Sequence, residues 1–120
     1  MVYVFDTNAV IYFLQGRGDF PEFSSSDVVI ISSITRLELL SGTLTDGEAA
    51  QANVFLGEIR EREVSKEVID EAILPRKSMR IRVPDAIILA TTIVENAVLV
   101  TADKELIEKA DRSRCHNPLP

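Results

Sequence analysis

The chain contains a single cysteine, Cys115, and a single histidine, His116. One cysteine excludes an internal disulfide. A single cysteine beside a single histidine also does not provide the spaced cysteine and histidine ligands that hold zinc. We therefore expect Cys115 to have no part in function.

Long hydrophobic runs are also missing. No apolar stretch reaches the roughly 18 residues that cross a bilayer, and the first residues lack the basic flank and small-residue cleavage site of a signal peptide. With 120 residues, of which 46% are hydrophobic and 27% charged, the composition is that of an ordinary globular protein. We expect one domain over residues 1–120 and a cytoplasmic location.

The chain has fewer basic residues than acidic ones. The formal net charge of −6 argues against a protein that coats nucleic acid through bulk positive charge. It does not exclude an enzyme that acts on nucleic acid, because such an enzyme can gather its acids in a metal site and its basic residues beside it. The distribution of charge therefore matters more than its sum.

Apolar runs alternate with amphipathic segments along the chain. Buried strands are predicted at 2–5, 28–31 and 97–100, where short runs are rich in β-branched residues. Helices are predicted at 8–14, 34–41, 47–62, 66–74 (ended by Pro75), 86–94 and 104–110. Residues 64–65 and the region near Cys115 are either loops or very short strands. The alternation predicts an α/β fold in which a parallel β-sheet is flanked by α-helices.

Two of the predicted strands end in a carboxylate. Asp6 follows strand 2–5, and Asp103 follows strand 97–100 after Thr101 and Ala102. In open α/β sheets the carboxyl ends of the strands line the ligand crevice. The alternative for Asp6 is a cap at the start of the next helix, and this stretch alone leaves both roles open.

Two further acids lie on predicted helices. Asp85 begins the apolar helix 86–94, where the helix dipole favours an acid and offers a purely structural role. Glu38 lies at the edge of the stripe that we expect to face the core. That stripe consists of Ile34, Leu37 and Leu40. A capping-box role with Thr35, or a solvated position, is the alternative for Glu38.

Right-handed crossovers bring the strand ends to one edge of the sheet, so at least three of these acids should share a crevice. Clustered carboxylates repel one another unless they are protonated or bridged by a cation. Ligands that are all oxygen select a hard ion such as Mg²⁺ or Mn²⁺. The predicted ligands are Asp6, Glu38, Asp85 and Asp103.

Four basic side chains precede Asp85 within seven residues. They are Arg76, Lys77, Arg80 and Arg82. A solvated loop and a phosphate-contact patch are both open for such a segment. Its position directly before a predicted metal ligand favours the phosphate-contact role.

Four segments carry a shared pattern. They are Val-Phe-Asp-Thr-Asn (4–8), Ile-Thr-Arg-Leu-Glu-Leu (34–39), Val-Pro-Asp-Ala-Ile-Ile-Leu-Ala-Thr (83–91) and Leu-Val-Thr-Ala-Asp-Lys-Glu-Leu (99–106). In this order and at this length they resemble the PIN-domain family, especially the small ribonuclease toxins of the VapC type. The resemblance covers nearly the whole chain. Many relatives have an acid before an aromatic residue in the last segment, whereas here Glu105 precedes Leu106.

The resemblance implies a homodimer that cleaves RNA with Mg²⁺ or Mn²⁺ and is blocked by a cognate antitoxin protein. It assigns catalysis and metal binding to Asp6, Glu38, Asp85 and Asp103, and supporting polar roles to Thr7, Asn8 and Thr101. The expected reaction is hydrolysis of a phosphodiester by a metal-activated water. Arg76, Lys77, Arg80 and Arg82 would then hold the RNA backbone.

Three other functions are compatible with parts of this pattern. A metal-dependent phosphatase with Asp6 as nucleophile would place a second acid two residues later, where Asn8 stands. A PIN domain that matures RNA has the same chemistry as a toxin. A binding module with a vestigial site is disfavoured because all four acids are present.

Overall fold

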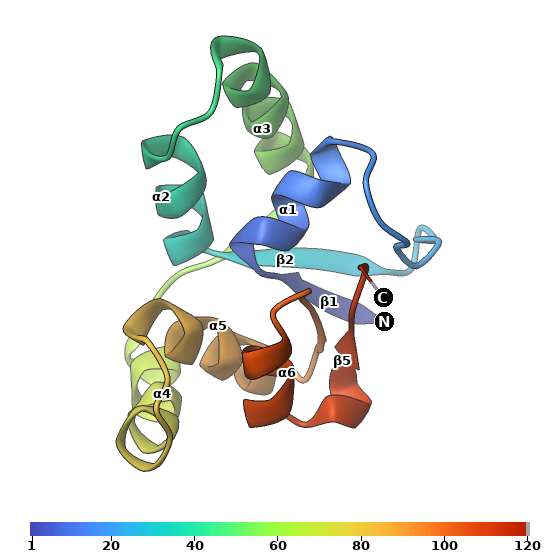
Figure 1. Ribbon diagram of the computed structural model, residues 1–120. Helices are drawn as coiled ribbons and strands as arrows, with labels where there is room; N and C mark the ends of the chain where they lie inside the picture. Colours follow the sequence, from blue (N-terminus) through green and yellow to red (C-terminus); the bar gives the residue numbers. More distant parts are fainter. Residues whose placement is uncertain (120) are drawn as a thin grey trace.

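The computed structural model describes residues 1–119 (Figure 1). Its centre is a five-stranded sheet in the order β3-β2-β1-β4-β5, and every neighbouring pair of strands is parallel. The strands are β1 (Val2–Phe5), β2 (Val28–Ser32), β3 (Arg60–Arg62), β4 (Val98–Val100) and β5 (Cys115–His116). The predicted α/β fold with a parallel sheet is confirmed, as is the short strand near Cys115.

Helices cover both faces of the sheet. They are α1 (Thr7–Leu14), α2 (Ser33–Ser41), α3 (Asp46–Glu58), α4 (Lys66–Ser78), α5 (Val83–Val94) and α6 (Lys104–Lys109), with a 3₁₀ turn η1 (Arg112–Arg114) before β5. Figure 1 shows α1, α2 and α3 on one side of the strands and α4, α5 and α6 on the other. This two-sided cover explains why β1 and β2 are apolar at nearly every position. No helix in residues 1–119 is long and apolar enough to cross a membrane.

Each face of the sheet has its own core. On one face Val4, Ile30 and Leu99 pack with buried residues of α4, α5 and α6. On the other, Phe5 and Ile31 pack with α1 and α2. Four phenylalanines extend this second core as a chain of stacked and edge-on rings: Phe5, Phe13, Phe20 and Phe23. The strands are thus clamped between two apolar layers, which fixes where their carboxyl ends lie.

The predicted helix over 47–62 is wrong at its end. Helix α3 stops at Glu58, and Arg60–Arg62 forms β3 beside β2 with Ile30 opposite Arg60 and Ser32 opposite Arg62. Charged residues suit an edge strand because one side of it faces solvent. Of the two alternatives left open for residues 64–65, the loop is correct, since Ser65 caps α4 by accepting a hydrogen bond from the Val68 amide. The charged sequence of this stretch is equally compatible with the exposed face of a helix. Its pairing with β2 in the folded protein is what makes it a strand.

Helix α4 continues through Pro75, where the sequence predicted an end. Proline removes one backbone donor and crowds the preceding turn. Here the Pro75 ring is buried, and the helix resumes with the Met79 amide donating to the Pro75 carbonyl at 2.9 Å. Packing of the ring therefore offsets the lost hydrogen bond. As a result Arg76 and Lys77 lie in the last turn of α4, not in a loop.

The stripe that helix α2 turns to the core only partly matches the predicted one, in which Ile34 alone packs against the core. Thr35 and Leu39 are buried, whereas Leu37 is 61% exposed and Leu40 is 44% exposed. The buried pair is spaced four residues apart, as helical packing requires. The prediction failed because it followed the largest apolar side chains. The two leucines instead form part of an apolar surface.

Candidate active site

Asp6 lies at the carboxyl end of β1 and is buried. One carboxylate oxygen, Oδ1, accepts a hydrogen bond from the Ala9 amide at 2.8 Å, so Asp6 caps α1. The other oxygen, Oδ2, accepts a hydrogen bond from the Thr101 hydroxyl. Pairing of Phe5 with Val100 places Thr101 at this position, directly after β4. Asp6 is therefore both a helix cap and the buried centre of a polar cluster.

The pKa of Asp6 is raised to about 6, chiefly because burial penalises the charged carboxylate. The hydrogen bonds from Thr101 and Ala9 act in the opposite direction, and the negative charges of Asp103 and Asp85 raise the pKa further. These contributions show that Asp85 and Asp103 lie close enough to Asp6 to repel it. Three acids that are far apart in sequence thus share one electrostatic environment.

Glu38 joins this group through Thr7. The Thr7 hydroxyl donates a hydrogen bond of 2.6 Å to Glu38 Oε1, across 31 residues of sequence. Because Thr7 directly follows Asp6, the partly buried Glu38 side chain lies beside the end of β1. The capping-box alternative for Glu38 is excluded, since Ser32 caps α2 by accepting from the Ile34 amide.

Asp103 and Asp85 each begin a helix. Asp103 Oδ1 accepts from the amides of Glu105 and Leu106 at the start of α6, and the Asp103 amide donates to the Thr101 hydroxyl oxygen at 3.1 Å. Asp85 lies in the first turn of α5, and its Oδ2 accepts a hydrogen bond of 3.2 Å from Arg82 Nε. The fold therefore gathers all four predicted acids at the carboxyl edge of β1 and β4. Of the supporting residues, Thr7 and Thr101 bond directly to these acids, and Asn8 is exposed in the first turn of α1.

The donor chemistry of this cluster fits a hard divalent cation, because it offers carboxylate oxygens that repel one another without a positive charge between them. In residues 1–119, however, no three Asp, Glu, His or Cys side chains are arranged so that they could hold an ion as they stand. Three of the four acids are each held by a hydrogen bond from a neighbouring side chain. Thr7 holds Glu38, Thr101 holds Asp6, and Arg82 holds Asp85.

The four basic residues are divided between the last turn of α4 and the segment that precedes α5. Arg76 lies against an apolar groove between α4 and α5 that is also lined by Ile73 and Val83. Arg80 lies in the segment between α4 and α5, where its carbonyl accepts a hydrogen bond from the Lys109 side chain of α6. Only Arg82 contacts one of the four acids. Its ion pair with Asp85 has no signal in the sequence beyond the spacing of three residues.

A hydrogen-bond network at the ends of β2 and β3 was not predicted from the sequence. Ser33 Oγ and Arg36 Nε donate to the two oxygens of Glu61 at 2.6 and 2.7 Å. The Ser33 hydrogen bond is the largest contribution that lowers the pKa of Glu61. Because 60–62 was predicted as helix, nothing indicated that Glu61 would reach α2. This network fixes α2, and with it Glu38, against the edge strand.

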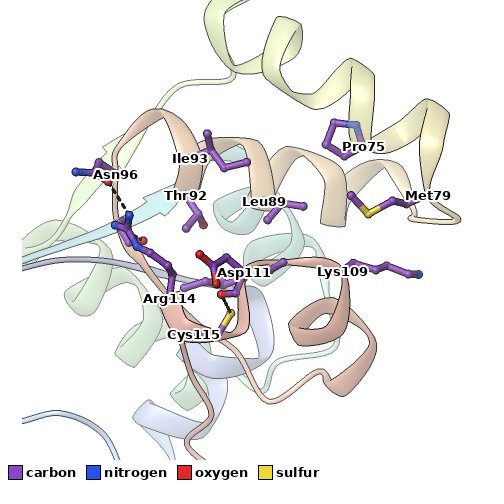
Figure 2. Close-up of a pocket in the computed structure, with 13 residues that line it drawn as sticks. Pro75, Met79, Leu89, Thr92, Ile93, Asn96, Lys109, Asp111, Arg114 and Cys115 are labelled. Atoms are coloured by element: carbon purple, nitrogen blue, oxygen red, sulfur yellow. Dashed lines mark hydrogen bonds between the residues drawn. The ribbon is translucent and has the colours of Figure 1, made fainter.

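A separate pocket of about 300 Å³ lies between α5 and the segment from α6 to β5 (Figure 2). Its apolar wall includes Met79, Leu89 and Ile93, and none of the four acids lines it. The Arg114 guanidinium at its rim donates to Asn96 Oδ1 at 2.8 Å and to the Ala97 carbonyl at 3.3 Å. This pocket therefore belongs to a different part of the molecule from the acidic cluster.

The model of the PIN domain family matches residues 3–112. The chain belongs to the PIN domain family. Among solved structures, this PIN domain is similar to a chain of VapBC2 from Rickettsia felis bound to a promoter DNA fragment, with 20% identity, a TM-score of 0.79 and 98% of each chain covered. It is also similar to a chain of a toxin-antitoxin complex from Klebsiella pneumoniae, with 21% identity, a TM-score of 0.74 and 97% of each chain covered.

A third similar structure is DNA-bound VapBC from Salmonella typhimurium, with 18% identity, a TM-score of 0.77 and 97% of each chain covered. At these identities the likeness establishes the shared fold of the PIN domain. A comparison with curated protein sequences finds no significant match.

Proposed function

We propose that this PIN domain is a Mg²⁺- or Mn²⁺-dependent endoribonuclease and the toxin of a type II toxin-antitoxin pair. The observation that carries the catalytic part is the gathering of four acids around a buried Asp6 whose pKa is raised to about 6. Such perturbed, mutually repelling carboxylates are typical of functional sites. The toxin part is supported by the likeness of the fold to chains of VapBC and toxin-antitoxin complexes.

Asp6 and Asp85, with Glu38 and Asp103, would hold the ion. When bound, a divalent ion supplies an activated water and offsets negative charge on the phosphodiester. Thr101 orients the Asp6 carboxylate and Thr7 orients Glu38, as polar partners of metal ligands commonly do. Asp103 is fixed by two backbone amides of α6, which leaves little freedom for its side chain.

The proposed substrate contacts come from the basic side chains. Arg80 and Arg82 precede α5, whose first turn carries Asp85. An RNA strand entering beside Asp85 would meet their positive charge, and phosphate contacts of this kind are largely independent of sequence. Arg76 and Lys77 lie further back on α4 and would contact only a longer strand.

Two exposed apolar surfaces are candidate binding sites for protein partners. Leu37 and Leu40 lie on α2, the helix that carries Glu38, so a protein that covers the acids can also cover these leucines. We assign this surface to the antitoxin, with an Arg or Lys directed at the acids. Ile69, Ile73 and Val83 border the apolar groove between α4 and α5. We assign that surface to a second copy of the chain, because exposed patches of this kind mark interfaces.

The decisive experiment is induced expression in a bacterial host followed by sequencing of RNA ends. The proposal expects new RNA ends and slowed growth with the parent, and neither with Asp85→Asn. Asp70→Asn is the matched control, because Asp70 is an exposed acid that only pairs with Lys66 on α4. New ends without any growth defect would favour a nuclease that matures RNA. No new ends with either protein would contradict the ribonuclease proposal.

A further inference from the structure

Arg82 is a positive charge placed among the acids. Its Nε lies 3.2 Å from Asp85 Oδ2, and although the Arg82 side chain is 78% exposed, that of Asp85 is only 19% exposed. The pKa of Arg82 is raised first by Asp85 and its hydrogen bond, and then also by Asp103 and Glu38. Of the four acids, Asp85 alone is hydrogen-bonded to the guanidinium, whereas Asp103 and Glu38 act on it through their charge from further away.

The backbone around Arg82 is held on both sides. Ile81 is buried, and the Arg80 carbonyl accepts a hydrogen bond from Lys109 of α6. On the other side the Arg82 carbonyl accepts from the Ala86 amide at 2.9 Å in the first turn of α5. Because the main chain is fixed, the side chain can leave Asp85 only by rotating about its own bonds. Its exposure gives it room to do so.

The guanidinium and a divalent ion compete for one carboxylate. A hard ion needs Asp85 oxygens directed at the other acids, whereas Arg82 holds Oδ2. Two cations at neighbouring positions would also repel each other. The Arg82 hydrogen bond to Asp85 is one of three that hold these acids in place, beside those of Thr7 to Glu38 and Thr101 to Asp6.

We propose that Arg82 is a built-in counter-ion of the acidic cluster that competes with the divalent cation for Asp85 and turns away when the cation binds. This inference rests on the proposed metal-dependent function and adds a residue that sets metal affinity. The displaced guanidinium, on the residue three positions before Asp85, would then be free to contact a phosphate of the substrate. Metal binding would thereby free the Arg82 guanidinium to bind phosphate.

The test is isothermal titration of Mn²⁺ into metal-free parent, Arg82→Gln and Arg80→Gln. The two variants remove the same charge two residues apart, so general electrostatics is matched. An exposed ion pair has a modest strength, so we expect Arg82→Gln to bind Mn²⁺ about two- to fivefold more tightly than Arg80→Gln. Arg82→Lys should fall in between, because it keeps the charge but loses the planar fork.

Thermal melts separate this role from a structural one. In EDTA, Arg82→Gln should melt at the same or a lower temperature than the parent, because the acids lose their counter-ion. At a fixed Mn²⁺ concentration it should gain more in Tm than the parent does. A purely structural Arg82 would lower Tm equally with and without Mn²⁺.

The outcomes distinguish this inference from the function on which it rests. Equal or weaker Mn²⁺ binding by Arg82→Gln, relative to Arg80→Gln, overturns the counter-ion role while parent binding leaves the metal-dependent function standing. Absence of Mn²⁺ binding in all three proteins contradicts both.

Discussion

The acids and the basic residues of this protein are arranged in opposite ways. Asp6, Glu38, Asp85 and Asp103 are spread over nearly the whole chain, yet the fold brings them to one edge of the sheet. The four basic residues lie within residues 76–82, yet two of them end α4 and one pairs with Asp85. A parallel sheet collects strand ends, whereas a helix turns successive side chains in different directions. Closeness in sequence therefore predicted less than position relative to the strands.

The largest expected effect comes from the buried centre of the acidic group. Asp6→Asn keeps the volume and the hydrogen-bond acceptor for the Ala9 amide but removes the charge. We expect loss of RNA cleavage on the order of a thousandfold, because the metal contribution to such reactions is worth several kcal/mol. The measurement is cleavage of a labelled RNA with Mg²⁺, with Asp70→Asn as control. Retained cleavage would remove Asp6 from the catalytic group.

The same residue should give the protein an unusual dependence of stability on pH. The folded-state pKa of Asp6 is about 6 against an ordinary value of 3.8, so between these pH values the folded state binds more protons than the unfolded state. Stability should therefore fall as pH rises through this window, by up to about 3 kcal/mol from this group alone. Denaturant unfolding of metal-free protein at pH 4 to 7 measures it.

Asp6→Asn is the control for this dependence, since it lacks the titrating group. The difference in unfolding free energy between parent and variant should change across pH 4 to 6 and be constant above it. A difference that is flat over the whole range would mean that Asp6 is not perturbed. Metal binding should show the reverse trend and weaken below about pH 6, because protons compete with the ion for the carboxylate.

Loss of one proposed ligand should show in the response to metal. Divalent ion at about one hundred times its Kd stabilises the folded form by roughly 2.7 kcal/mol, a shift in Tm on the order of 10 °C for a domain of this size. Asp85→Asn should remove most of this shift. In EDTA it should be about as stable as the parent, because the relief of repulsion among the acids offsets the loss of the exposed pair with Arg82. Thermal melts at constant protein concentration test this. An equal shift of Tm on adding metal to both proteins would mean that Asp85 only stabilises the start of α5 and does not bind the ion.

The smallest expected effect separates the basic residues from one another. Arg80→Gln should weaken RNA binding and reduce the slope of log affinity against log salt by about 0.7, the value for one phosphate contact on a single strand. Arg76→Gln should change this slope less for a short RNA, because Arg76 lies by the apolar groove between α4 and α5. Binding in Ca²⁺, at several salt concentrations, is the measurement. Equal slopes for both variants would mean that the segment acts only through general charge.

The local sequence was sufficient to predict the acidic edge. Short runs of β-branched residues that end in Asp6, or in Thr101 followed by Asp103, indicate buried strands whose tips carry polar groups, and the structure places them there. The apolar run that becomes α5 likewise indicated a buried helix that begins near Asp85, and residues 86–92 are all buried. These signals are strong because burial between two helical layers requires nearly continuous apolar residues, which are easily seen in a sequence.

Tertiary contacts alone decided the rest. Arg60–Arg62 became a strand because β2 offered an unpaired edge, and α4 passed through Pro75 because its ring is buried against neighbouring helices. The two roles of Asp6, cap and buried acid, were alternatives in the sequence and coincide in the fold, since the same strand end begins α1 and faces Thr101. The pairing of Arg82 with Asp85 likewise depends on where α5 begins and on Lys109 holding the chain before it. Each of these features depends on contacts with distant segments, whose energies exceed the small local preferences that a sequence displays.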